Sequence, residues 1–145
     1  IVHGHAKAQT IESHLVRDRG DGLRGSTAQA GEGQRAVTHL RPLEYLPGYT
    51  LVECTLETGR THQIRIHLAE AGHMVCGEKV YVQRLHGKPV TDRSGAARQA
   101  LHAAALDFVH PITGQRLEFE MPLPDDMRRL LERLRRPHDL GGADP

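Results

Sequence analysis

The sequence is poor in aromatic residues and has no long apolar run. Aromatic residues make up 3% of the chain and tryptophan is absent, which argues against a platform that stacks many successive bases of a single strand. No window approaches the roughly eighteen consecutive apolar residues of a membrane-spanning helix. Residues 1–5 also lack the charged-then-apolar pattern of a secretion signal. We therefore expect a soluble cytoplasmic protein.

Cysteine and excess charge are scarce as well. Cys54 and Cys76 are the two cysteines and show no CxxC spacing, so a disulfide framework or a four-ligand zinc site is not expected. Lys and Arg number 19 against 18 Asp and Glu, far from the basic excess that by itself indicates a nucleic-acid binder. With 38% hydrophobic and 26% charged residues, the composition predicts one globular domain and leaves the substrate open.

The middle of the chain predicts an antiparallel hairpin. Residues 36–46 and 49–57 flank Pro47-Gly48, a dipeptide typical of a tight turn. The second strand alternates apolar with polar residues, which predicts one buried face. The apolar residues of that face are Val52, Cys54 and Leu56.

Residues 61–71 change to a helical period. Gly72 follows, where a left-handed residue commonly ends a helix. The apolar face of this predicted helix consists of Ile64, Leu68 and Ala71. Residues 17–35, rich in Gly and charge, predict a long exposed loop that is either a contact surface or simply solvated. Residues 72–99 predict loop and short elements.

A second hairpin and a final helix are predicted near the end. Residues 101–110 and 115–121 form the hairpin, with one face buried that consists of Leu117, Phe119 and Met121. The helix begins at Pro124 and stops at Pro137. Its apolar stripe consists of Met127, Leu130, Leu131 and Leu134.

Thr58 to His67 is the segment most suggestive of chemistry, because it places two arginines, two histidines and a glutamine at a strand-to-helix junction. Gly59 lets the backbone turn, and N–H groups of a first helical turn can face an anion. Arg60 and Arg65 are five residues apart and point roughly 140° away from each other on a helix, so they should act differently. His62 and His67 are separated in the same way and no HExxH occurs, so we do not expect a metal site.

A resemblance to a known family rests on this segment and on two others. Thr58 to His67, followed by Gly72-His73, Gly77 and Tyr81, resembles the corresponding segment of RluA-type RNA pseudouridine synthases. A second block agrees, consisting of Arg98, Leu101-His102-Ala103, Leu106, Phe108 to Pro111, Thr113-Gly114 and Pro122 to Pro124. At the front, a weaker stretch resembles the part that follows an active-site tyrosine in the family. It consists of Val2, Gly4-His5, Ile11, Leu15 and Arg17-Asp18. Glu78 stands where the family usually has aspartate.

The resemblance implies an α+β fold, with a mixed, mainly antiparallel sheet and flanking helices. Residues 1–137 would form the C-terminal part of the catalytic domain, and residues 138–145 a disordered tail. The implied activity converts specific uridines in structured RNA, ribosomal or transfer RNA, to pseudouridine without cofactor or metal. The intact enzyme would be a monomer. Nothing here matches the family's motif with the nucleophilic aspartate. We therefore expect that residue upstream of Ile1, and expect the 145-residue chain alone to be inactive and marginally stable.

Arg65 would be the catalytic arginine by this resemblance. A guanidinium can bind the aspartate through two hydrogen bonds, fix its orientation and keep it ionised. Such a carboxylate is suited to act as a nucleophile. The alternative is that Arg65 merely pairs with a carboxylate of this chain, such as Glu57.

Six other residues are candidates for substrate binding. Arg60, Thr61, His62 and Gln63 would contact RNA or line the pocket, although helix capping and surface hydrogen bonds explain them nearly as well. Ile64 and Leu101 would line the uracil pocket, and core packing is the alternative for both. Arginines of the final helix would offer RNA a basic surface or simply face solvent.

Three functional hypotheses remain open. The chain belongs to an active synthase, or it is a non-catalytic RNA-binding remnant of the same fold, or it is a metal or acid-base hydrolase built on its eleven histidines. The upstream coding sequence, salt-dependent RNA binding and metal content distinguish the three.

Overall fold

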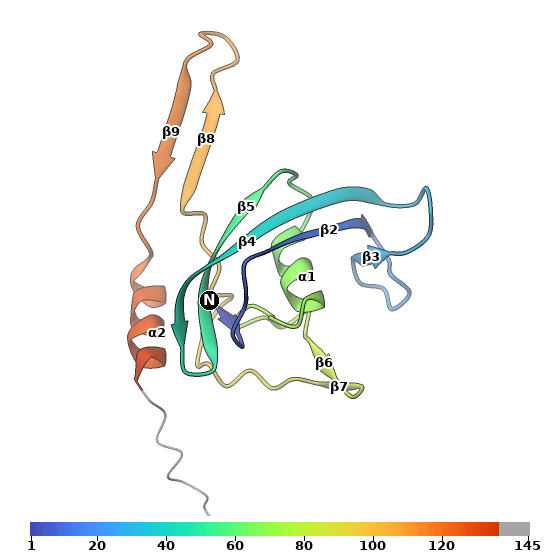
Figure 1. Ribbon diagram of the computed structural model, residues 1–145, viewed down its shortest axis with the longest axis vertical. Helices are drawn as coiled ribbons and strands as arrows, with labels where there is room; N and C mark the ends of the chain where they lie inside the picture. Colours follow the sequence, from blue (N-terminus) through green and yellow to red (C-terminus); the bar gives the residue numbers. More distant parts are fainter. Residues whose placement is uncertain (137–145) are drawn as a thin grey trace, which may run out of the picture.

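Five strands form the central sheet in the computed structural model, which describes residues 1–136 (Figure 1). Neighbouring strands are antiparallel, and their spatial order is β1 (Val2–His3), β5 (Tyr49–Leu56), β4 (Gln34–Leu46), β2 (Gln9–Val16) and β3 (Gly25–Thr27). Two separate hairpins pair β6 (Arg84–Leu85) with β7 (Lys88–Pro89) and β8 (Ala105–Val109) with β9 (Arg116–Glu120). The helices are α1 (Gln63–Glu70) and α2 (Asp125–Arg135). This confirms the predicted α+β class with a mainly antiparallel sheet.

The predicted hairpin of residues 36–46 and 49–57 is confirmed as β4 and β5. Gly48 adopts a φ of +78°, which suits the tight turn after Pro47. Val52 and Cys54 face the core as predicted. Leu56 does not, because it lies at the end of the strand and 43% of its surface is exposed.

The sequence did not predict strands β1, β2 and β3. In β2 the inward positions are Ile11, Ser13 and Leu15, so a hydroxyl interrupts the apolar alternation. That hydroxyl is satisfied by the ring of His67 on α1, at 2.9 Å. The prediction of one long exposed loop over residues 17–35 is therefore wrong in part, because β3 lies within this range and β4 begins at Gln34.

Helix α1 packs on the sheet and is buried on nearly all sides. Leu68 joins a cluster with Val2 and Leu40, and Ile66 joins a second cluster with Leu15. His67 is fully buried between Ser13 and Thr38, and burial lowers the pKa of its imidazole. The helix ends before Gly72, whose φ is +86°. The sequence predicted one buried apolar face for this helix, whereas the structure also buries polar residues on its other sides.

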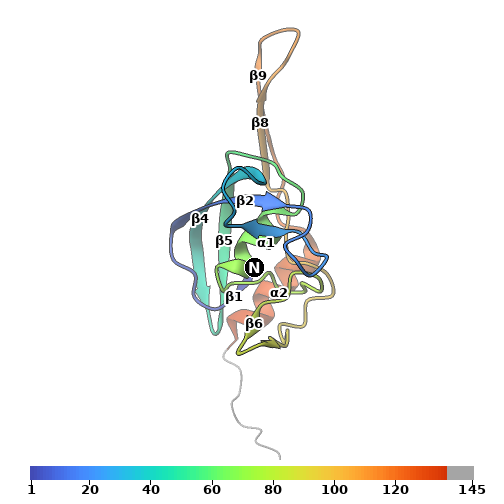
Figure 2. The same cartoon turned by 90° about the vertical axis from the view of Figure 1, so that its right-hand side faces the viewer.

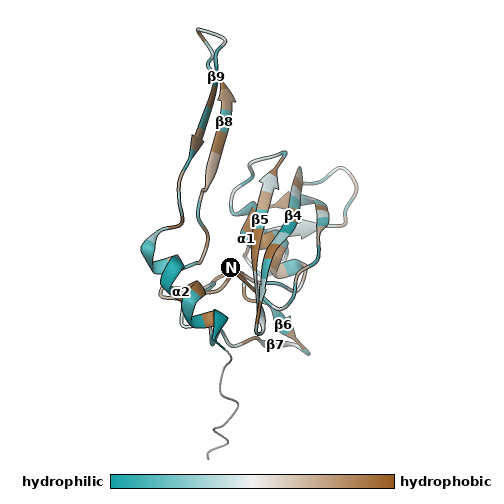
Figure 3. Cartoon of the chain, turned by 60° about the vertical axis from the view of Figure 1, so that its left-hand side comes forward, coloured by the Kyte–Doolittle hydropathy of each residue, from teal (hydrophilic) through white to brown (hydrophobic). Residues whose placement is uncertain are grey.

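Helix α2 packs its predicted apolar stripe against the β1–β5 side of the molecule (Figures 2 and 3). The buried residues of the helix are Met127, Leu130, Leu131 and Leu134. Pro124 precedes the first turn in an extended conformation. The expected stop at Pro137 and the tail of residues 138–145 lie outside the described residues. Neither described helix has the length and apolarity needed to span a membrane.

The β8–β9 hairpin projects from the body as a long arm (Figure 1). Both strands form as predicted, but the predicted half-buried sheet is wrong. Phe119 and Met121 are 53% and 61% exposed. Alternation predicts two faces of a strand, but it does not say what covers either face. Within residues 1–136 Phe119 packs mainly against the Phe108 ring, with centroids 6.1 Å apart.

Candidate active site

The turn into α1 is organised by the side chain of Gln63, which is 2% exposed. Its Oε1 accepts hydrogen bonds from the Thr58 hydroxyl at 2.7 Å and the Arg60 N–H at 3.0 Å. Its amide nitrogen donates to the Val37 carbonyl and the Thr38 hydroxyl, both at 3.0 Å. Because the amide is engaged on both ends within the protein, Gln63 shapes the turn that presents its neighbours.

Arg65 lies inside the fold, with 11% of its side chain exposed. Its Nε and Nη2 donate to the two carboxylate oxygens of Glu78 at 2.8 and 2.7 Å. The guanidinium carbon lies 5.0 Å from the centre of the Tyr81 ring, within cation–π range. Two neighbours therefore fix the orientation of Arg65 before any ligand arrives.

The Glu78 carboxylate is held as tightly as the arginine. Its side chain is fully buried and it also accepts the backbone N–H groups of Val80 and Tyr81, at 3.0 and 3.1 Å. Burial alone would raise the pKa of Glu78, but the hydrogen bonds from Arg65 and from the two N–H groups outweigh it, and the pKa lies below its ordinary value. The same hydrogen bond raises the pKa of Arg65. Both groups are thus charged.

The carboxylate of this chain that binds Arg65 is Glu78, and Glu57 instead contacts His39 at 3.0 Å. A guanidinium carries five N–H donors, of which Glu78 takes one on Nε and one on Nη2. Nη1 makes no hydrogen bond within residues 1–136, and no buried side-chain nitrogen is left without a partner in that range. Nη1 is therefore reached by solvent. The outer edge, formed by Nη1 and the second hydrogen of Nη2, therefore has no hydrogen-bond partner within residues 1–136.

His62 stands at the start of α1 in a left-handed conformation, with a φ of 56°. This conformation is uncommon for a residue with a side chain. The imidazole Nδ1 lies 2.7 Å from the Tyr81 hydroxyl. Burial, followed by the charges of Arg65 and Arg24, lowers the pKa of His62. His62 is thus an exposed ring fixed beside the tyrosine that supports Arg65.

Arg60 and Thr61 lie on the outer side of this turn. The Arg60 Nε donates to the Arg35 carbonyl at 3.0 Å. Both residues line a cavity of about 380 Å³ that also includes Arg17 and Arg24.

Ile64 and Leu101 pack against the same apolar cluster, although they are far apart in the sequence. Both are partly buried against Val2, Leu68 and Val75. Leu101 also lines a shallow hollow of about 430 Å³ together with Gly77 and Lys79, the residues on either side of Glu78. The two side chains thus provide an apolar surface near the ion pair.

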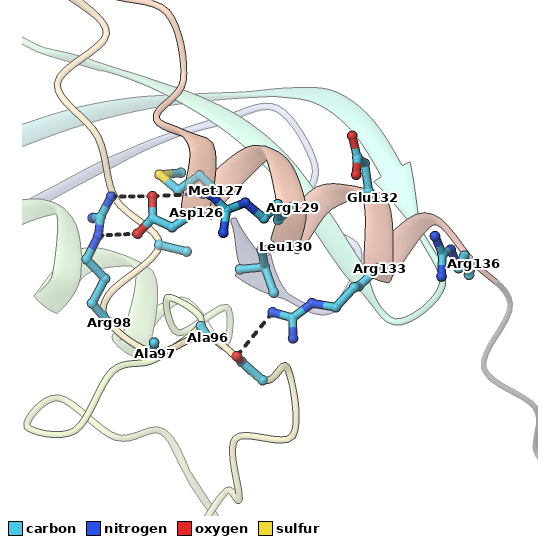
Figure 4. Close-up of a pocket in the computed structure, with 12 residues that line it drawn as sticks. Ala96, Ala97, Arg98, Asp126, Met127, Arg129, Leu130, Glu132, Arg133 and Arg136 are labelled. Carbon is cyan, nitrogen blue, oxygen red and sulfur yellow. Dashed lines mark hydrogen bonds and ion pairs between the residues drawn. The ribbon is translucent and has the colours of Figure 1, made fainter.

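Another hollow lies between α2 and residues 95–100, with a volume of about 480 Å³ (Figure 4). At one end of this hollow, the Nε and Nη2 of Arg98 donate to the two carboxylate oxygens of Asp126 at 2.7 and 3.1 Å. Arg133 donates to the Gly95 carbonyl at 3.2 Å. Three arginines of the final helix line it, Arg129, Arg133 and Arg136, but Arg65 and the six residues predicted to bind substrate do not. Across residues 1–136 no three side chains of the metal-binding types gather into a metal site.

Comparison with known proteins assigns the chain to a family. Residues 1–70 match the family described as RNA pseudouridylate synthase. An uncharacterized RNA pseudouridine synthase of Bacillus subtilis, YlyB, is 45% identical over 138 residues, which cover 94% of this chain and 43% of the relative. Ribosomal large subunit pseudouridine synthase D of Zymomonas mobilis is 40% identical over 136 residues, with coverages of 92% and 43%. The chain belongs to the RluA-type RNA pseudouridine synthases.

Solved structures support the same fold. Human RNA pseudouridylate synthase domain containing 4 superimposes with a TM-score of 0.70 at 21% identity, over 92% of this chain and 60% of that one. The human domain containing 1 protein gives a TM-score of 0.65 at 25% identity, with coverages of 92% and 62%. The chain thus spans less than half the length of the two curated bacterial relatives and about three fifths of these synthase structures.

Two residues that surround Arg65 were not assigned a function from the sequence. Glu78 and Tyr81 are 13 and 16 residues beyond Arg65, and no helical or strand period relates them. The available signal was the family motif that contains both positions. It marked Glu78 as a departure from the usual aspartate and did not indicate that it contacts Arg65.

Proposed function

We propose that the protein to which this chain belongs converts specific uridines of ribosomal RNA to pseudouridine in the cytoplasm. Its relative in Zymomonas mobilis is named for the large ribosomal subunit, which favours ribosomal over transfer RNA. Residues 1–137 would be the C-terminal part of the catalytic domain of a monomeric enzyme. The observation that carries the proposal is Arg65, held by Glu78 and Tyr81 with its outer edge open.

In this proposal the open edge of Arg65 receives the nucleophilic aspartate, supplied by a segment upstream of Ile1. Two charge-assisted hydrogen bonds orient that carboxylate, and the positive charge opposes the rise in pKa that burial would cause. Glu78 neutralises part of the guanidinium charge and fixes its plane. Arg65 can then bind without losing side-chain freedom at the time of reaction.

The reaction is an isomerisation that needs no cofactor. The bond between N1 of uracil and C1′ of ribose breaks, the base turns, and a bond forms from C5 to C1′. The proton lost from C5 is balanced by one gained at N1, so no atoms or electrons are exchanged overall. The target base has to leave its stack to reach the carboxylate. Ile64 and Leu101 would contact the apolar face of the uracil, while Arg60, Thr61 and His62 would contact the RNA next to it.

One experiment tests both the proposed activity and the alternative, a non-catalytic RNA-binding remnant. The complete gene product is incubated with transcripts of large-subunit ribosomal RNA and of transfer RNA, and pseudouridine is mapped at single-nucleotide resolution. We expect modification at one or a few uridines of the ribosomal transcript. The 145-residue chain alone serves as the control and should modify neither RNA. Binding of the complete protein without any pseudouridine would contradict the proposed activity and favour the remnant.

A further inference from the structure

A second hollow next to the site carries a local excess of positive charge. We call it the arginine cavity, and it is lined by Leu15, Val16, Arg17, Arg24, Gly33, Gln34, Arg60 and Thr61. It lies where the end of β2, the following loop and the start of β4 meet the turn into α1, on the side of the molecule that Figure 2 turns toward the viewer.

The three arginines of this cavity are not neutralised by the protein. No aspartate or glutamate lines it. Arg17 and Arg24 make no ion pair or side-chain hydrogen bond with any residue from 1 to 136, and Arg60 donates from Nε to a backbone carbonyl alone. Other arginines of the chain are paired with carboxylates, for example Arg35 with Glu12 and Arg41 with Glu53. Three arginines without a carboxylate partner among residues 1–136 therefore meet at this hollow.

The cavity adjoins the Arg65 site through His62. Arg60 and Thr61 directly precede His62 in the chain, and His62 contacts the Tyr81 ring that supports Arg65. Partial burial, followed by the charges of Arg65 and Arg24, lowers the pKa of His62, so both guanidinium groups act on this ring. A polymer bound at Arg65 can thus extend past His62 into the arginine cavity.

We propose that the arginine cavity binds one phosphodiester group of the RNA backbone, next to the nucleotide that is placed at Arg65. Guanidinium groups suit this ligand, because their planar forks match phosphate oxygens and remain charged at any physiological pH. Backbone contacts of this kind fix the register of a nucleic acid without selecting its sequence. Arg24, which is half-buried, and Arg17 and Arg60, which are exposed, would share the anion. The inference rests on RNA being the substrate.

The experiment compares RNA affinity of the complete gene product with that of an Arg17→Gln/Arg24→Gln variant. Neither side chain supports the fold through a polar contact among the described residues, so the variant should fold normally. The matched control is Arg41→Gln, which removes an exposed arginine from the β4–β5 surface. The probe is the ribosomal RNA fragment that contains the modified uridine. We expect at least about tenfold weaker binding for the double variant. The slope of log affinity against log salt should also fall by about 1.

A second measurement locates the phosphate. A neutral methylphosphonate linkage is placed at each position around the target uridine in turn. We expect one linkage to weaken binding to the wild-type protein, and we expect the same linkage to cause no further loss in the double variant, since the two changes remove one interaction. Equal losses in both proteins at every linkage would overturn the proposal, because they indicate a diffuse positive surface. Unchanged affinity of the double variant would overturn it as well.

Failure of the proposed function would be seen in pseudouridine formation, whereas failure of the arginine-cavity proposal would be seen in RNA binding. If the wild-type protein makes no pseudouridine but binds ribosomal RNA, the affinities of the wild-type protein and the double variant for that RNA still test the arginine cavity. If pseudouridine forms, the double variant should raise KM and keep kcat near the wild-type value at saturating RNA. A loss confined to kcat would contradict a backbone-binding subsite.

Discussion

Arg65 and Glu78 form a buried ion pair in which each partner depends on the other. Removing one charge from such a pair leaves the other desolvated and without compensation, which costs more than the intact pair contributes. The exposed pair between Arg41 and Glu53 is the natural contrast, because solvent can replace either partner.

We expect Glu78→Gln to lower the free energy of unfolding by about 3 kcal/mol or more, and Glu53→Gln by less than about 1 kcal/mol. Because the pKa of Glu78 is depressed in the folded protein, its contribution is fully present above the ordinary value of 4.5 and is lost as the pH falls through the lower folded value. Urea unfolding, followed by circular dichroism from about pH 6 down to about pH 3, measures both effects. An acid dependence that is identical in wild-type and Glu78→Gln proteins would contradict this account of the pair.

At the residue scale the sequence singled out Arg65 but did not indicate Glu78 as its partner in this chain. The family motif marked Arg65, and the geometry of a guanidinium predicted a bidentate carboxylate. Which carboxylate of this chain fills that position depends on the path of residues 72–81, and no local pattern determines that path. Leu101 likewise reaches the cluster of Ile64 through tertiary packing alone.

At the scale of helices and strands, helix α2 and the β4–β5 hairpin were predicted well, because each shows a regular apolar pattern that matches the surface it buries. The stripe of α2 repeats with helical period and packs against one cluster, so its buried residues were identified correctly. The β4–β5 hairpin was fixed by its turn and alternation. Strand β2 was missed because the half-buried Ser13 points inward and forms a hydrogen bond with His67, a contact that the sequence pattern does not reveal. In β8–β9 the pattern was right and the covering layer was wrongly assumed.

We expect substitutions on α2 and on the arm to differ sharply in the 145-residue chain. Leu134 is 1% exposed, and Leu134→Ala should lower the free energy of unfolding by about 2–5 kcal/mol. Phe119 is 53% exposed and packs on one ring, so Phe119→Ala should cost less than about 1.5 kcal/mol. Thermal unfolding of the two variants measures the difference. Equal destabilisation would mean that the arm is part of the core.

On the scale of the whole molecule, the body and the arm have different surfaces. The body buries three apolar clusters between the sheet and the helices. The arm exposes several large apolar side chains in the chain as described (Figure 3), namely Leu106, Phe108, Val109, Ile112, Phe119 and Met121. Exposed apolar side chains in such number are typical of a contact region. The curated relatives are more than twice as long as the matched region.

The predicted fold class and family were confirmed at this scale, whereas the nucleophile was predicted to lie outside the chain. The proposed activity therefore depends on one relation, in which Glu78 and Tyr81 hold Arg65 so that its outer edge would bind the catalytic carboxylate. Glu78 and Tyr81 would act as positioning residues, and Arg65 would contact the reacting groups. A lysine at position 65 would keep the charge but would lose the planar fork.

The most direct measurement is single-turnover pseudouridine formation by the complete gene product carrying Arg65→Lys. Arg41→Lys is the matched control, and circular dichroism checks that both variants fold. We expect the rate to fall at least about 100-fold for Arg65→Lys, since two charge-assisted hydrogen bonds to the nucleophile are lost, and to stay near the wild-type value for Arg41→Lys. A folded Arg65→Lys protein that turns over at a near-normal rate would contradict the assigned function of this arginine.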